Sequence, residues 1–147
     1  MGFFIGMLDH KNNIIKWNIM DIIANLTRVD RENKFENIFD KYFELLNDDT
    51  MITLGHVVDN SSVIANAKPH LAEKITKKLL KLEKMKTKPK VTHECKNILY
   101  GKAIITFDKY YSNIDNKEEV ISFVERQLKN PRLSTQAKAE KFLKKYR

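Results

Sequence analysis

The chain has 147 residues, of which 42% are hydrophobic, and a mean hydropathy of −0.48, which predicts one domain with its own core and excludes a membrane-embedded protein. No apolar run approaches the length of a membrane span, and the apolar start Phe3–Ile5 lacks the basic residues of a signal peptide. The single cysteine, Cys95, cannot form an internal disulfide, so we expect a cytoplasmic protein without a membrane partner.

The net charge of +8 is unevenly distributed. Residues 1–60 hold six Lys and Arg against ten Asp and Glu, a net charge of −4, whereas residues 61–147 hold 21 against nine, a net charge of +12. Such a field attracts polyanions, acidic proteins or anionic surfaces to the C-terminal half. The alternative is that the lysines only keep the outer helix faces soluble.

Four consecutive segments share one pattern, an amphipathic helix, a short polar turn and a second helix. In the first segment, Phe3–Leu8 is the remnant of a first helix and residues 10–13 form the turn. One continuous apolar stripe from Ile15 to Leu26 marks the second helix.

In the second segment, we expect Asp30 to cap a helix that reaches Leu46. We expect a partner helix at Met51–Ala65, and the alternative is a strand at Met51–Val58, which is rich in β-branched residues.

The third segment opens at Pro69, a residue favoured at the first helical position. A stripe of lysines lies away from the buried side of this helix: Lys74, Lys77, Lys78, Lys81 and Lys84. After a charged connection, Thr92 opens a long second helix that ends near Tyr111.

In the fourth segment, Asn116 and Glu119 resemble a capping box, and Asn130–Pro131 separates the first helix from the second. We expect Ser134 or Thr135 to cap the last helix.

The spacing of these segments favours stacked helices over an α/β fold. The second helices are expected to start at Asn13, Met51, Thr92 and Leu133, at intervals of 38, 41 and 41 residues. A nearly constant interval of this size is typical of stacked helical hairpins, and an isolated strand at Met51–Val58 or Ala103–Phe107 would find no sheet to join. We therefore predict an all-α, right-handed superhelix, an α-solenoid of about four hairpins.

The segment Ile15–Leu26 resembles the HEAT-repeat consensus, with an aliphatic and then a basic residue at its start and an aliphatic pair near its eighth position. Thr135 and Gln136 with Ala139, Phe142 and Leu143 repeat the pattern loosely. The chain departs from it at Thr53 and His56, and at Glu94 or Lys96. The resemblance to HEAT and ARM proteins implies a fold and a binding habit, and it transfers no catalytic residue.

On this interpretation, residues 1–147 form a single HEAT-like domain whose N-terminal repeat is incomplete. The short first helix Phe3–Leu8 leaves Ile15, Ile19 and Ile22 incompletely covered. We therefore expect either further repeats upstream or self-association through this apolar end.

The candidate chemical groups favour a structural interpretation. His93, Glu94 and Cys95 are neighbours on a helix and cannot converge on one metal ion. His56 and Asp59 with Ser61 or Ser62 lack a strained nucleophile turn and a glycine-rich oxyanion site. We predict no catalytic residue, metal or cofactor. Gly101 is expected to permit close approach of a neighbouring helix.

In a solenoid of this kind the second helices line the concave side, so their polar positions form the expected binding groove for a protein partner. The candidates are Lys16, Trp17, Asn18, Asp21, His56, Asp59, Asn60, Lys96, Asn97, Tyr100, Gln136 and Lys138. For Trp17, a half-buried core position and an exposed anchor are equally supported. The mixed charge of this groove favours protein recognition over a phosphate track.

The alternative function is nucleic-acid binding through Lys74, Lys77, Lys81, Lys84 and the basic C-terminal residues. The resemblance also extends to HEAT-like proteins that clasp DNA by its backbone, some of which are base-excision glycosylases. That enzymatic variant is the least favoured, because Asp21 and Asp59 are the only carboxylates expected in the groove.

Overall fold

The computed structural model describes residues 1–147 and confirms an all-α protein. Its α-helices are α1 (Gly2–Ile5), α2 (Asn13–Leu26), α3 (Lys34–Phe43), α4 (Met51–Ala67), α5 (Ala72–Leu80), α6 (His93–Tyr110), α7 (Lys117–Gln127) and α8 (Leu133–Tyr146). Short 3-10 turns extend several of them: η1 (Thr27–Val29), η2 (Glu44–Asn47), η3 (Pro69–Leu71), η4 (Lys81–Lys84) and η5 (Tyr111–Asn113). The only β-type pairing is an isolated bridge between Lys88 and Val91.

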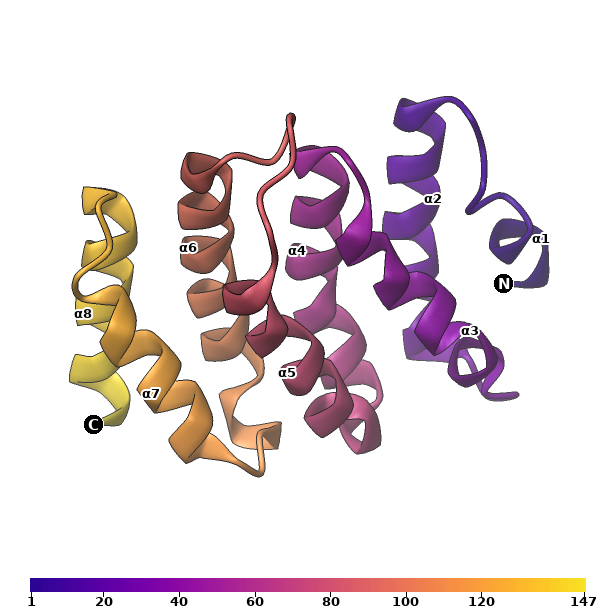
Figure 1. Cartoon of the computed structure of the whole chain (residues 1–147). Helices are drawn as coiled ribbons and strands as arrows, with labels where there is room; N and C mark the ends of the chain where they lie inside the picture. Colours follow the sequence, from indigo (N-terminus) through magenta and orange to yellow (C-terminus); the bar gives the residue numbers. More distant parts are fainter.

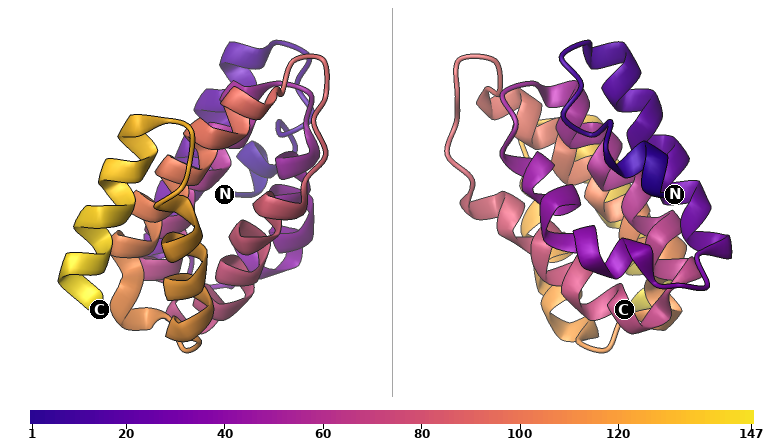
Figure 2. Two further views of the ribbon diagram at one scale, coloured as in Figure 1. Left: turned by 60° about the vertical axis from the view of Figure 1, so that its left-hand side comes forward. Right: turned by 90° about the vertical axis from the view of Figure 1, so that its right-hand side faces the viewer.

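The helices form two layers. Helices α2, α4, α6 and α8 stand side by side, and each makes extensive contacts with the next one in the row (Figure 1). Helices α3, α5 and α7 form the second layer, which crosses the first obliquely (Figure 1), and Figure 2 shows both layers from the sides. Helix α1 packs against α2 at the N-terminal end.

The long helices of the first layer begin where the sequence pattern predicts. Helices α2, α4 and α8 start at Asn13, Met51 and Leu133, and Thr92 is the N-cap of α6, where its hydroxyl accepts the N–H of Cys95. Such a cap satisfies one of the unpaired amides of the first turn.

Two other caps differ from expectation. Asp30 lies too far upstream to be the N-cap of α3, but its carboxylate still accepts the N–H groups of Lys34 and Phe35. Helix α8 begins before Ser134 and Thr135, with Arg132 as its N-cap residue, so neither residue caps it. The expected cap at Asn116 is confirmed, because its side chain accepts the N–H of Glu119.

Helix α4 forms despite its β-branched start and its polar centre. Ser61 donates to the carbonyl of Val57, and Ser62 donates to that of Asp59. These bonds satisfy buried hydroxyls within the helix, and neighbours on both sides bury ten of its residues, so tertiary packing overrides local propensity.

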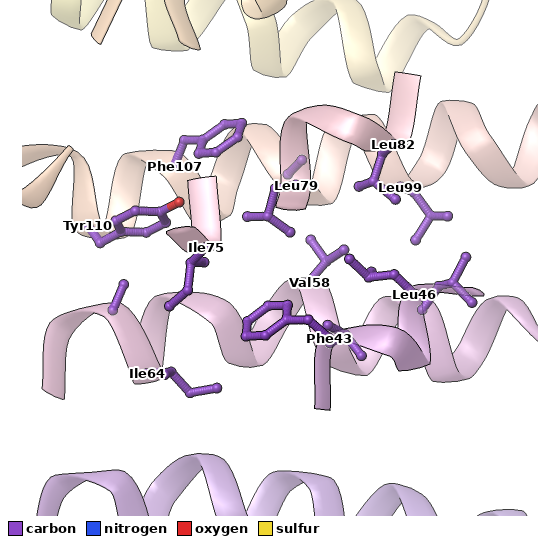
Figure 3. Packing of buried hydrophobic residues seen from close by; sticks show 14 of the residues in the cluster. Phe43, Leu46, Val58, Ile64, Ile75, Leu79, Leu82, Leu99, Phe107 and Tyr110 are labelled. Carbon is purple, nitrogen blue, oxygen red and sulfur yellow. The ribbon is translucent and has the colours of Figure 1, made fainter. Parts of the chain in front are cut away.

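The core lies between the two layers, where apolar side chains from α3, α5 and η4 meet those of α4 and α6 (Figure 3). Phe43, Ile75 and Leu79 from one layer are buried with Val58 and Phe107 from the other. Burial of these side chains removes apolar area from water and holds the first layer in place.

A buried lysine joins the end of α4 to the start of α3. The ammonium of Lys68 lies 3.3 Å from the carboxylate of Asp30 and 2.8 Å from that of Glu36, and only 5% of its side chain is exposed. Burial alone would raise the pKa of Asp30, but the amides of Phe35 and Lys34 and the nearby ammonium together lower it. The carboxyl groups of Asp30 and Glu36, whose pKa values are both lowered, are therefore ionised beside Lys68.

No helix combines the length and apolar character that a bilayer crossing requires.

Candidate functional site

The candidate binding surface is the open face, the side of the α2–α4–α6–α8 layer that points away from α3, α5 and α7 (Figure 1). Helix α4 shows how it arises. Thr53 and Asn60 of α4 turn toward α2, Gly55 turns toward α6, and Leu54 is buried toward the second layer. The helical period then leaves one side of α4 uncovered, with Ile52 near its centre.

Polar side chains of the open face link α2 to α4. The imidazole Nδ1 of His56 lies 2.8 Å from a carboxylate oxygen of Asp21, and the Asn60 amide donates to the same oxygen at 2.8 Å. The Trp17 indole donates to the Thr53 hydroxyl at 2.9 Å and stacks on the His56 ring at 9° between planes. The structure therefore brings these predicted groove residues together, but their polar groups bond to one another across the α2–α4 junction.

The Asp21 contacts continue into the core through Tyr42. The Asn60 amide also donates to the Tyr42 hydroxyl at 3.1 Å, and that hydroxyl donates to the carbonyl of Met20. Burial raises the pKa of Tyr42 well above its ordinary value, so this hydroxyl acts as a neutral bridge.

The same type of link recurs at the next two junctions. Between α4 and α6, the Lys102 ammonium lies 3.0 Å from the carboxylate of Asp59. Between α6 and α8, the Thr135 hydroxyl donates to the carbonyl of Asn97 at 2.8 Å. We call the contacts Trp17–Thr53, Asp21–His56–Asn60, Asp59–Lys102 and Asn97–Thr135 the polar ladder, and they hold the four helices in register.

Gly101 lies beside the last of these contacts. A Cβ at this position would lie 3.0 Å from the hydroxyl oxygen of Thr135 and 3.3 Å from the Lys138 side chain. The close approach of α8 to α6 therefore depends on a residue without a side chain, as the sequence predicts.

Several candidate residues lie away from the open face. The Lys16 ammonium pairs with Asp48 at 3.0 Å, at the end of η2. The Lys96 ammonium donates to the carbonyl of Met85, and Gln136 donates to the carbonyl of Asn130. Each of these residues lies on the side of its helix that faces the second layer. Their polar groups therefore bond within the protein.

Tyr100 differs most from the expected position. Its ring packs edge-to-face on Phe123 of α7 with 6.0 Å between ring centroids, and its hydroxyl points toward the carbonyl of Leu82. Burial, with the charge of Glu83, raises the pKa of Tyr100. This tyrosine lies between the layers. The candidates that remain at the open face are Trp17, Asn18, Asp21, His56, Asp59 and Lys138.

The open face also carries exposed aliphatic side chains, of which the sequence pattern indicated only Ile22; Ile19, also expected to be incompletely covered, is buried. Ile14 and Ile22 of α2 are 65% and 37% exposed, Ile52 of α4 is 53% exposed, and Ile105 of α6 is 42% exposed. Val63 of α4 is half-buried. Their apolar character suggested burial, and only the position of each residue on its helix relative to the neighbouring helices shows that it is uncovered.

Helix α8 lies at the end of the open face and carries basic side chains there. Lys138 and Lys141 occupy its open side, and neither ammonium pairs with a carboxylate. The open face therefore changes from aliphatic residues with an acidic pair on α2 and α4 to lysines on α8.

His56 and the neighbouring serines do not form a catalytic arrangement of nucleophile and base. Ser61 and Ser62 are buried and their hydroxyls donate to backbone carbonyls, so neither can receive a proton-abstracting contact from His56. No group of three His, Cys, Asp or Glu side chains converges as a metal site would require.

Comparison with protein-family models, curated proteins and solved structures gives no match to this chain.

Proposed function

We propose that the chain is a non-enzymatic binding module of the HEAT-like α-solenoid type, which recognises another protein through the open face. The regular recurrence of the long helices α2, α4, α6 and α8 and their two-layer packing support the solenoid assignment. In such proteins each repeat contacts its neighbours, and the extended face that results is used for binding.

The observation that carries the proposal is the exposure of Ile14, Ile22, Ile52 and Ile105 on one layer. Uncovered aliphatic residues among polar ones are typical of an interface, where an apolar centre is surrounded by a polar rim. The polar ladder fixes the helices that present these residues, so the surface is preorganised.

Capture of a partner from native lysate, compared between variants, tests this function. In the variant Ile52→Asp/Ile105→Asp, each new carboxylate would be desolvated at the interface, so we expect partner recovery to fall by about tenfold or more. Val29→Asp is the control, because Val29 is 69% exposed but lies in η1. Equal recovery with the double variant and the wild type would refute binding through the open face.

A second candidate function is nucleic-acid binding, favoured by the lysines of α5, η4 and α8 that lack carboxylate partners. Lys74, Lys81 and Lys84 form no ion pair, and Lys77 forms only an exposed pair with Glu73. Phosphate contacts release counterions, so binding through these lysines must weaken steeply as salt rises. A mobility shift with duplex DNA at low salt that disappears at physiological salt would support this candidate, and no shift at low salt would remove it.

A further inference from the structure

A hollow lined by lysines lies outside the open face, between the ends of the second-layer helices. It occupies about 620 Å³ between η2 and η4 and extends beneath the connection that follows η4. Its lysines are Lys78, Lys81, Lys84, Lys86 and Lys88. Glu44 is the only carboxylate in its lining, and it accepts a hydrogen bond from the Asn47 amide.

Four of the five ammonium groups have no partner within the protein. Lys78, Lys81, Lys84 and Lys86 form no ion pair and no side-chain hydrogen bond. Lys88 is held in place, with its ammonium donating to the carbonyls of Asn47 and Asp48. The nearby carboxylate of Glu83 is turned toward α7, where it pairs with Arg126.

The helix dipole accounts for only part of this cluster. Cations at the last turn of a helix are stabilised by its carbonyl end, which explains Lys78, Lys81 and Lys84. Lys86 and Lys88, however, lie in the connection beyond η4, where no such turn exists. This connection is held in place by the Lys88–Val91 bridge, by the bond from Lys96 to the carbonyl of Met85, and by the bonds of the Lys88 ammonium.

From this hollow we infer that the protein binds a compact phosphate-bearing anion with several negative charges, either a free polyphosphate or a polyphosphorylated headgroup. A concave space of this size suits a small ligand. A terminal phosphate group brings nearly two negative charges and a bridging group brings one, so two or three groups supply about the four charges of the unpaired ammonium groups. The compact charge of lysine suits phosphate groups in any orientation.

An acidic peptide fits the hollow less well. In an extended segment, side chains on one face repeat about every 6.6 Å, so four carboxylates cannot converge on one hollow. Nucleobase recognition is also disfavoured, because the only aromatic side chain in the lining, Phe43, is 2% exposed and offers no stacking surface. The inference is independent of the protein-binding function, which does not use this hollow, whereas it shares Lys81 and Lys84 with the nucleic-acid candidate.

The test is a titration of the ¹⁵N-labelled full chain with inorganic tripolyphosphate, followed by amide chemical shifts and calorimetry at physiological salt. We expect saturable shifts confined to residues 44–48 and 78–88. The variant Lys78→Gln/Lys81→Gln/Lys84→Gln should bind at least about tenfold more weakly. The control Lys138→Gln/Lys141→Gln/Lys144→Gln loses the same charge on α8 and should bind as the wild type does.

No binding by the wild type, or equal weakening in both triple variants, would overturn the inference, since the second result means attraction by net charge alone. Poly-glutamate that binds as tightly as tripolyphosphate would overturn the phosphate assignment. Shifts in the wild-type spectrum locate the site without any variant. Vesicles that contain a phosphatidylinositol bisphosphate distinguish the source: binding displaced by tripolyphosphate identifies a headgroup, and tripolyphosphate binding without vesicle binding identifies a free anion.

Discussion

Asp21 on α2 and His56 on α4 form a 2.8 Å contact across the first helix junction of the open face, and the same carboxylate oxygen accepts the amide of Asn60. Asn60 is only 8% exposed. Because two neighbouring side chains depend on Asp21, this carboxylate is a structural residue of the α2–α4 junction.

Asp21→Ala should therefore lower the free energy of unfolding by about 1–3 kcal/mol, because the buried Asn60 amide loses its strongest acceptor. Asp59→Ala is the matched control: it removes the corresponding carboxylate of α4, whose pair with Lys102 is more exposed, and should cost about 0–1 kcal/mol. Urea denaturation followed by circular dichroism measures both. A cost for Asp59→Ala equal to that for Asp21→Ala would contradict this distinction.

Lys68 and Asp30 form the most buried ion pair of this chain, with side chains that are 5% and 3% exposed. Lys68→Met should destabilise the protein by about 3–5 kcal/mol, because the buried carboxylate of Asp30 and the half-buried carboxylate of Glu36 lose their cation. Lys77→Met, which breaks only the exposed pair with Glu73, should change stability by less than about 0.5 kcal/mol. Equal unfolding midpoints for the two variants would show that the Lys68 cluster is not formed in solution.

The stability should fall in acid because several carboxyl groups have lowered pKa values in the folded state: Asp30, Glu36, Asp48 and Asp108. Burial raises each of these pKa values, but hydrogen bonds and nearby lysines outweigh it. A depressed pKa contributes stability that is present above the unfolded-state pKa and is lost as the pH falls through the folded-state value. The free energy of unfolding should thus be constant between about pH 7 and pH 5 and decline below that. Urea titrations at a series of pH values that show no decline down to pH 3 would refute this.

Two helical glycines offer a comparison of backbone and packing effects. A Cβ at Gly55 would meet only the flexible Lys102 side chain, at 3.6 Å, so Gly55→Ala should stabilise the protein by about 0.5–1 kcal/mol through helix propensity. At Gly101 the Cβ would crowd the Thr135 hydroxyl, which is fixed by its bond to Asn97. Gly101→Ala should therefore be less stable than Gly55→Ala by at least about 1 kcal/mol. In a Thr135→Ala background, which removes the crowded hydroxyl, Gly101→Ala should again stabilise the protein. Thermal unfolding of Gly55→Ala, Gly101→Ala, Thr135→Ala and Gly101→Ala/Thr135→Ala measures these differences.

The positions of the helices could be predicted from the sequence because their causes are local. Apolar spacing marks the stripe of α2, and Thr92 and Asn116 act as caps within a few residues of their own position. Met51–Val58 is the exception, since its β-branched residues permit a strand and burial on both sides of α4 decides for the helix.

The use of each polar residue could not be predicted, because it depends on which helix lies next to it. Asp21, Trp17 and Lys16 are all polar or amphipathic positions of α2, but the approach of α4 and η2 turns each toward a partner inside the protein. Conversely, Ile52 and Ile105 have the apolar character of core residues and remain uncovered because no element of the chain packs on that side.

The sequence by itself therefore determined an all-helical chain, the starts of its long helices and its basic C-terminal half, since periodicity, capping and charge are properties of neighbouring residues. Only the tertiary structure decided that Asp21 links two helices, that Tyr100 lies between the layers and that Lys78 and Lys86 share one hollow. These relationships join residues far apart in the chain, or on either side of a turn, and the packing of one layer on the other sets their distances.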